Sequence, residues 1–153
     1  MQHEPQQIIT EFYQAFKDLD AEKMISFYSY NVIFEDPAFG RLNGERAANM
    51  WRMLIESQKG KDFVVEFSHV TENSAHWEAH YTFSQTGRKV HNIISAQFEI
   101  QNGKITKHTD HFNLHAWAKQ ALGFKGWLLG GTRFFQKKLQ AQTNRLLDKF
   151  EGK

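Results

Sequence analysis

The sequence predicts a single α+β domain, and three observations support this expectation. The chain has 153 residues, which is an ordinary length for one domain. Apolar residues recur at helical spacing near both ends of the chain, and they alternate with polar residues through its middle. Helices that precede a run of antiparallel strands are typical of α+β folds, because each layer buries its apolar face against the other.

Two helices are expected at the start of this domain. In residues 6–19 the apolar positions are three or four residues apart, which indicates a helix with one buried face. Asp20 can cap a short second helix, because aspartate accepts hydrogen bonds from the free N–H groups of a first turn. The apolar residues of this second helix extend to Tyr28.

A short strand and a third helix are expected next. Residues 31–36 are β-like and end at Pro37, which cannot donate to a strand ladder. Residues 39–44 are expected to form a loop. The third helix carries its apolar residues on one side, namely Ala47, Trp51, Leu54 and Ile55.

Four antiparallel strands in a meander are predicted for the middle of the chain. Period-two alternation marks each strand, and turn residues separate them. Asn102-Gly103 is the strongest turn signal, because both residues tolerate the backbone of a tight hairpin. The strands are expected over residues 63–67, 77–83, 90–100 and 105–114.

A basic amphipathic helix is expected to close the chain. After a break at Gly130-Gly131, its apolar positions are Phe135, Leu139, Leu146 and Phe150. We expect this stripe to cover the domain or a partner subunit. Contact with an anionic membrane is the less favoured alternative.

Charge is distributed unevenly along the chain. From residue 125 to 153 there are seven Lys or Arg and two Asp or Glu, whereas residues 1–124 carry twelve and fifteen. The net charge of +2 is too small to indicate a nucleic-acid binder.

Composition excludes several classes of site. The absence of cysteine excludes Cys-ligated zinc, iron–sulfur clusters and a thiol nucleophile. No apolar run is long enough to span a membrane, and residues 1–5 lack the character of a signal peptide, so a cytoplasmic location is expected. With 14 Phe and 4 Trp, the domain should have a bulky core or an aromatic-lined cavity.

The first recognisable motif surrounds Asp36. Phe34-Glu35-Asp36-Pro37, followed by a loop and Gly44, resembles the segment that carries the catalytic aspartate in the ketosteroid-isomerase-like and SnoaL-like families of the NTF2-like superfamily. Tyr13 lies one helix upstream, where these isomerases have a tyrosine, and Tyr28 matches a second tyrosine of some members. The order of elements is similar up to about Leu122.

This resemblance implies a fold and an assembly. The fold would be an NTF2-like cone, in which a curved antiparallel sheet wraps around the N-terminal helices and encloses a pocket for a small hydrophobic molecule. Residues 1–122 would form the SnoaL-like domain, and residues 123–153 would form a helical extension packed on it. The resemblance also implies a homodimer joined through the open sheet face, and no cofactor.

The resemblance further implies roles for Asp36 and Tyr13. Asp36 would be a general base that removes a proton next to a carbonyl group, and Tyr13 would hydrogen-bond the enolate oxygen. Asp36 could instead cap its own turn, and Tyr13 could be a core residue. Ala96 departs from the family pattern, because it stands where a second, protonated acid completes the oxyanion hole. Loss of one such donor costs about 2.7–4 kcal/mol, which argues against steroid isomerisation at the rates of the family.

A second motif involves the last strand. Gly103-Lys104-Ile105 followed by Asp110 resembles the hairpin that precedes the acid/base aspartate of SnoaL-type polyketide cyclases. Alternation predicts one inward face, made of Thr106, His108, Asp110, Phe112 and Leu114. A buried carboxylate is costly unless it is paired. Asp110 and His108 would therefore be an acid/base pair, or His108 would only satisfy Asp110. The Arg-x-Asp pattern of limonene epoxide hydrolases is absent from residues 76–84.

The pocket-lining candidates are Tyr28, Trp51, Ala96, Phe98 and Phe112, although aromatic residues at such positions also fill cores. The strand histidines do not predict a metal site. His76 and His80 share a face but lie about 13–14 Å apart along an extended strand, and the same holds for His111 and His115.

Three functions follow from these observations. The leading hypothesis is a cofactor-independent isomerase or cyclase that acts by acid/base chemistry on a small apolar carbonyl compound of steroid-like or polyketide-like character. The second is a pocket that binds a small hydrophobic ligand without chemistry. The third is a dimeric scaffold whose cone is packed solid.

Overall fold

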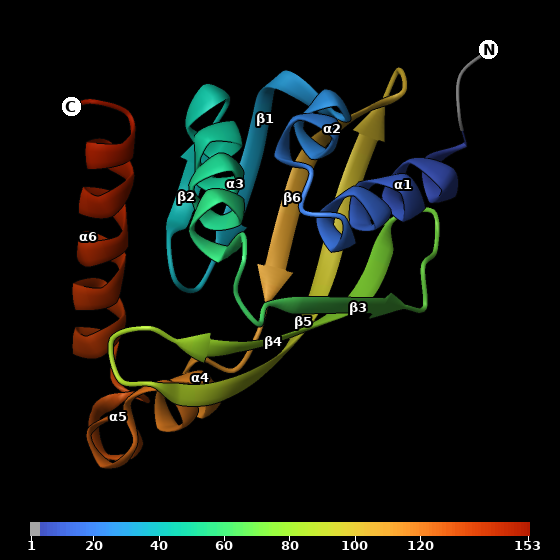
Figure 1. Ribbon diagram of the computed structural model, residues 1–153. Helices are drawn as coiled ribbons and strands as arrows, with labels where there is room; N and C mark the ends of the chain where they lie inside the picture. Colours follow the sequence, from blue (N-terminus) through green and yellow to red (C-terminus); the bar gives the residue numbers. More distant parts are fainter. Residues whose placement is uncertain (1–3) are drawn as a thin grey trace.

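The computed structural model describes residues 4–153, in which a curved six-stranded sheet carries helices on its concave side and at one end (Figure 1). Residues 1–3 lie outside the described residues. They belong to the first five residues, which were not expected to form a signal peptide. The helices are α1 (Pro5–Lys17), α2 (Ala21–Ser26), α3 (Glu45–Gln58), α4 (Leu114–Leu122), α5 (Phe124–Leu129) and α6 (Arg133–Phe150). The strands are β1 (Tyr28–Asp36), β2 (Gly40–Asn43), β3 (Val64–Ser68), β4 (Ser74–Phe83), β5 (Arg88–Gln101) and β6 (Lys104–His111).

The strands are arranged in the order β2-β1-β6-β5-β4-β3. The antiparallel meander from β3 to β6 is as predicted, and Asn102 and Gly103 take the positive φ angles that its last hairpin requires. Strand β1 adds to β6 in parallel, so the sheet is mixed. The result is an α+β cone of NTF2-like type, with an open rather than a closed sheet.

Three predicted boundaries were wrong, and each has a local cause. Asp20 caps α2 by accepting from the N–H of Lys23, but α2 ends at Ser26 and Tyr28 begins β1 instead. Residues 40–43, expected in a loop, form β2, because a tight turn returns them alongside β1. The last strand ends at His111, since the side chain of Asn113 caps the unpredicted helix α4.

The alternation along β6 is also interrupted. A bulge opposite residues 99 and 100 makes Ile105, rather than Thr106, the buried residue at the start of the strand. Beyond the bulge, His108 and Asp110 are buried as predicted, whereas Leu114 lies outside the strand, in α4.

Helix α1 supplies the centre of the core. Its apolar face includes Phe12, Tyr13 and Phe16, which are completely buried. The Phe16 ring meets the rings of Trp51 on α3 and Trp77 on β4, with centroids 5.1 and 5.2 Å away. Helix α1 therefore fills one part of the concave side, and α3 lies over another part (Figure 1).

Helix α6 is fastened mainly by polar contacts. Arg46 of α3 forms ion pairs with Asp148 and Glu151 at 2.8 and 2.6 Å, and it also donates to Asn144. Asn144 in turn donates to the carbonyl of Phe39, in the turn that joins β1 to β2. Only Leu147 of α6 is fully buried. The helix stands beside α3 (Figure 1). Part of its apolar stripe is exposed rather than packed in the core, including Leu146 and Phe150.

Candidate active site

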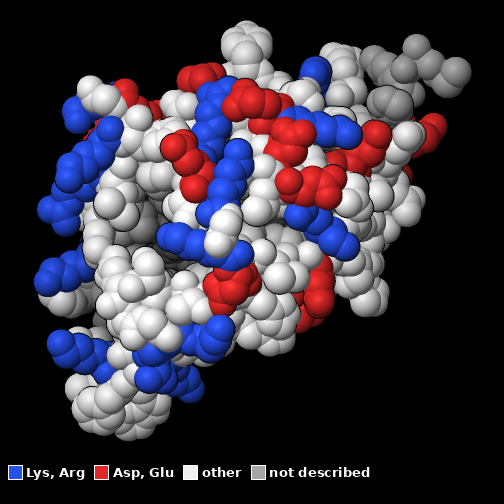
Figure 2. Space-filling model, in the orientation of Figure 1, with Lys and Arg blue, Asp and Glu red and all other residues white. Residues whose placement is uncertain are grey.

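A cavity of about 980 Å³ lies between the sheet, α3 and α6. The molecule is visibly hollowed between α3 and α6 (Figure 2). The walls of this cavity are mostly apolar and include Phe34, Met50, Trp51, Leu54, Ile94 and Phe112. A cavity of this size and character suits a small hydrophobic molecule. The cone is therefore not packed solid, whereas the scaffold hypothesis required a solidly packed cone.

Asp36 lies at the end of β1 and lines this cavity. Its Oδ1 accepts hydrogen bonds from the N–H groups of Ala38 and Phe39, at 3.0 and 2.6 Å. Both hydrogen bonds use the same oxygen, which leaves Oδ2 for a ligand. Asp36 thus caps its own turn through one oxygen and also lines the cavity.

The surroundings of Asp36 raise its pKa to about 7. Desolvation by the protein is the largest cause, and the negative charge of Asp110 adds to it. The hydrogen bonds from Phe39 and Ala38 act in the opposite direction, because they stabilise the charged form. A carboxyl group with this pKa can accept or release a proton near neutral pH.

A chain of hydrogen bonds links two residues of the cavity wall through two residues that lie behind it. The indole N–H of Trp51 donates to the Tyr28 hydroxyl at 2.8 Å, and that hydroxyl lies 2.7 Å from Nδ1 of His108. Nε2 of His108 lies 2.9 Å from Oδ1 of Asp110. Because Trp51 can only donate, the chain is satisfied when Tyr28 donates to Nδ1 and Nε2–H of His108 donates to Asp110.

Asp110 connects this chain to the cavity, which it lines. Its Oδ1 also accepts from the indole N–H of Trp77 at 3.4 Å. The sheet register places Asp110 directly opposite Ala96. The small side chain of Ala96, where the isomerase pattern has an acid, therefore faces a carboxyl group supplied by the neighbouring strand.

Tyr13 lies deeper than the sequence suggested. Its side chain is completely buried, its ring stacks on Phe67 at 5.6 Å, and it does not line the cavity. Among residues 4–153 its hydroxyl has no hydrogen-bond partner. Burial, followed by the charge of Asp110, raises the pKa of Tyr13 well above its usual value.

The structure divides the predicted site residues into two layers. Asp36, Asp110, Trp51 and Phe112 line the cavity. The second layer, which lies behind the wall, consists of Tyr13, Tyr28, Ala96, Phe98 and His108. His108 is enclosed there by rings, with the centroids of Phe98 and Trp51 at 4.3 and 6.1 Å.

Sequence reasoning missed two contributions to the cavity. Tyr81 lines it and accepts a hydrogen bond from the indole N–H of Trp117 at 2.7 Å, which leaves its own proton for a ligand. Alternation along β4 already placed Tyr81 on the same face as Trp77, so this signal was available. The other contribution is a wall of α6 that includes Leu139, Leu146 and the cations Lys138, Arg145 and Lys149.

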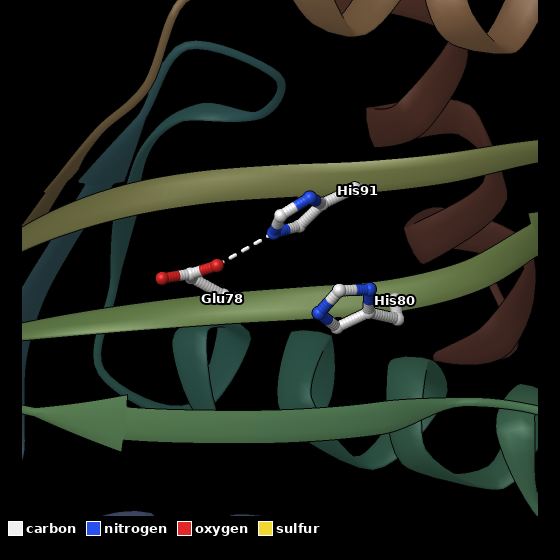
Figure 3. Close-up of side chains that lie close together, drawn as sticks. All are labelled: Glu78, His80 and His91. Atoms are coloured by element: carbon white, nitrogen blue, oxygen red, sulfur yellow. Dashed lines mark hydrogen bonds and ion pairs between the residues drawn. The ribbon is translucent and has the colours of Figure 1, made fainter.

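Among residues 4–153, one group of side chains could hold a metal ion, and it lies away from the cavity. Ligand atoms of Glu78, His80 and His91 fall within 4.8 Å of one another (Figure 3). The register pairs His80 with His91 across β4 and β5, a proximity that spacing along a single strand cannot reveal. Glu78 already accepts from His76 and His91, at 2.8 and 2.5 Å. These residues are not among those that line the cavity, so the chemistry considered below does not involve them.

Among residues 4–153, no helix combines the length and apolar character that a membrane span requires.

Residues 9–108 match the SnoaL-like domain. No curated protein sequence matches the chain.

Several solved structures share the fold. A candidate polyketide cyclase from Pseudomonas putida is 22% identical, with a TM-score of 0.59, and the match covers 78% of this chain and 98% of that one. An LEH-like epoxide hydrolase from M. tuberculosis is 21% identical, with a TM-score of 0.56 and coverages of 83% and 91%. SalBIII, an epoxide hydrolase/cyclase-like enzyme of pyran ring formation in salinomycin, is 18% identical, with a TM-score of 0.58 and coverages of 72% and 91%.

Proposed function

We propose that this chain, which belongs to the SnoaL-like family, is a cofactor-independent isomerase or cyclase that acts on a small apolar carbonyl compound. The observation that carries the proposal is Asp36, a carboxyl group with a pKa of about 7 on the wall of an apolar cavity. The candidate polyketide cyclase, epoxide hydrolase and cyclase-like enzyme that share the fold are consistent with acid/base chemistry in such a cavity.

In the proposed reaction Asp36 removes a proton from the carbon next to the carbonyl group. The free Oδ2 accepts this proton, while Oδ1 keeps the turn in place through Ala38 and Phe39. The apolar walls hold the substrate and exclude water, which favours proton transfer to a carboxylate.

The enolate oxygen needs a hydrogen-bond donor, and Tyr81 is better placed for this role than Tyr13. Tyr81 lines the cavity with its proton available, whereas Tyr13 lies behind the wall. Asp110, supported by His108 and Tyr28, would return or relay the proton. Return of the proton to the same carbon gives hydrogen exchange, and its return to another carbon gives isomerisation. Attack of the enolate on a second carbonyl group closes a ring.

The test uses 2-tetralone, an apolar ketone with acidic protons, as a probe of proton abstraction. In deuterated water the protein should accelerate exchange at the carbon next to the carbonyl, followed by NMR. The rate should rise between about pH 6 and about pH 8, as Asp36 becomes a base. Asp36→Asn should abolish the acceleration, and Tyr81→Phe should lower it at least about 100-fold.

Asp18→Asn is a matched control, because Asp18 is an exposed carboxylate that does not line the cavity. It should leave exchange unchanged. Wild-type exchange in Asp36→Asn would contradict the assignment of the base.

The second candidate function is binding of a small hydrophobic ligand without chemistry. It is favoured by one observation: neither Tyr13 nor an acid at position 96 provides an oxyanion donor in the cavity. Tight binding of 2-tetralone with no exchange at any pH would support this candidate over catalysis.

A further inference from the structure

A patch of large apolar side chains is exposed on α5 and the first turn of α6. We call it the α5–α6 patch, and its residues are Phe124, Trp127, Leu128, Leu129 and Phe134. Each is between 46% and 73% exposed. The rings of Phe124 and Trp127 are adjacent, with centroids 5.8 Å apart. Scattered apolar residues are ordinary on a protein surface, but a gathering of five this large marks an interaction site.

The backbone packing of α5 explains why these side chains point outward. Helix α5 lies so close to α4 that a Cβ on Gly126 would be 1.8 Å from the carbonyl oxygen of Ala118. His115 of α4 also bonds the carbonyl of Trp127 through Nε2, at 2.8 Å. The inner face of α5 thus consists of glycine and backbone, and its bulky residues have only the outer face.

The charged Lys, Arg, Asp and Glu positions of the segment that carries the patch are all cationic. Between Asp110 and Asp148 the sequence has six Lys or Arg and no Asp or Glu. Lys125, Arg133, Lys137 and Lys138 lie within or beside the patch, and none is in an ion pair with another described residue. Figure 2 shows the same asymmetry: the region over α5 and the start of α6 is blue and white, and the red side chains lie elsewhere.

We infer that the α5–α6 patch docks on the surface of an anionic lipid bilayer. Aromatic and leucine side chains enter the boundary between headgroups and acyl chains, while lysines and arginines contact the headgroups. A second copy of this chain fits less well, because two such patches face to face would bring like charges together with no acid between them. The inference revises the expectation that the basic C-terminal segment chiefly covers the domain, since the residues that dock lie largely on α5.

Docking would also place the cavity beside the lipid. The helices on either side of α5 line the cavity, α4 with Trp117 and Leu122 and α6 with Phe135 and Leu139. An apolar compound dissolved in the bilayer could then reach the cavity without crossing water. The docking itself does not depend on the proposed catalysis.

Sedimentation with vesicles tests the inference. The protein should sediment with vesicles of phosphatidylcholine and phosphatidylglycerol, much less with phosphatidylcholine alone, and less as salt is raised. Phe124→Ser with Trp127→Ser should weaken the partitioning at least tenfold. The matched control is Val64→Ser with Ile93→Ser, which removes two apolar residues of 51% and 54% exposure from the sheet. It should sediment as the wild type does.

Two further variants test the contribution of the cationic residues and the independence of docking from catalysis. Changing Lys125, Arg133 and Lys137 to Gln should remove the preference for the anionic lipid. Asp36→Asn should bind vesicles normally, so that a failure of catalysis and a failure of docking are read independently. Circular dichroism confirms that each variant is folded.

Three outcomes would overturn the inference. The first is no sedimentation of the wild type with anionic vesicles. The second is equal loss in the patch variant and the sheet control. The third is a dimer, seen by analytical ultracentrifugation, that the patch variant abolishes, because the patch would then be a contact between copies of this chain.

Discussion

At the scale of single residues, Asp36 combines a structural role with its proposed role as a base, and the two use different oxygens. Oδ1 holds the turn after β1, and Oδ2 is left for the cavity. The pKa of about 7 follows from this position, because desolvation outweighs the two backbone hydrogen bonds. A carboxyl group held in this way should have a cost in stability as well as a use in catalysis.

Asp36→Asn should therefore stabilise the protein at alkaline pH. In the unfolded chain an aspartate titrates near pKa 3.9, whereas folding raises the pKa of Asp36 to about 7. Between these values the folded state binds more protons, so the Asp36 contribution to stability falls as pH rises. Asparagine keeps the acceptor for Ala38 and Phe39 but does not titrate.

Urea unfolding at about pH 4 and about pH 8 measures the effect. The free energies of unfolding of wild type and variant should be similar at the lower pH, and the variant should be more stable at the higher pH. Each pKa unit corresponds to about 1.4 kcal/mol, so the gain should be a few kcal/mol at most. A variant that is less stable at both pH values would show that the carboxylate is not desolvated.

At the scale of elements, α6 depends on polar fastenings rather than on burial. Arg46 joins α3 to Asp148 and Asn144 of α6 and to Glu151, the residue that caps the C-terminus of α6. Gln140, Thr143 and Asn144 donate to carbonyls of the turn that follows Asp36. One wall of the cavity and the turn that carries the proposed base are thus tied together.

Arg46→Gln should loosen α6 selectively. The shorter, neutral side chain loses both ion pairs and the hydrogen bonds to Asn144, whereas Glu151 keeps Asn49 and Lys153 as partners. Amide hydrogen exchange in α6 should become about tenfold faster, while the sheet is unchanged. Arg52→Gln is the control, since Arg52 lies on the same helix but pairs with Glu22 and Glu45. Equal acceleration in both variants would contradict this role of Arg46.

At the scale of the whole molecule, the cavity exists because the helices cover different parts of a curved sheet. Helix α1 fills its part of the concave side with aromatic residues, whereas α6 stands off the sheet beside α3. The space between them is bounded by small or apolar sheet residues such as Ala79 and Ile94.

Ala79→Phe should fill part of the cavity at little cost in stability. A phenylalanine placed in a closed core would cost about 1–3 kcal/mol through overpacking, but here it has open space. The variant should bind the apolar dye ANS several-fold more weakly and unfold at nearly the same urea concentration. Ala141→Phe, at an exposed position outside the cavity, should bind the dye as the wild type does. Severe destabilisation by Ala79→Phe would mean that the cavity is not accessible.

The sequence by itself determined the fold class, the antiparallel meander and the two candidate carboxylates, Asp36 and Asp110. These features are local: helical and strand periods, the Asn102-Gly103 turn and the motif at Asp36 are each read within a few residues. The same locality explains why Asp110 and His108 could be assigned to the inward face of one strand.

Only the tertiary structure decided which of these residues reach the cavity. Tyr13 has the sequence position of a catalytic tyrosine but lies behind the wall, whereas Tyr81 lines the cavity with a free proton. Strand register likewise places Asp110 opposite Ala96 and pairs His80 with His91. The close approach of the α4 and α5 backbones turns the bulky residues of α5 outward. Contacts between strands and helices far apart in the chain set these distances, and no spacing along one segment records them.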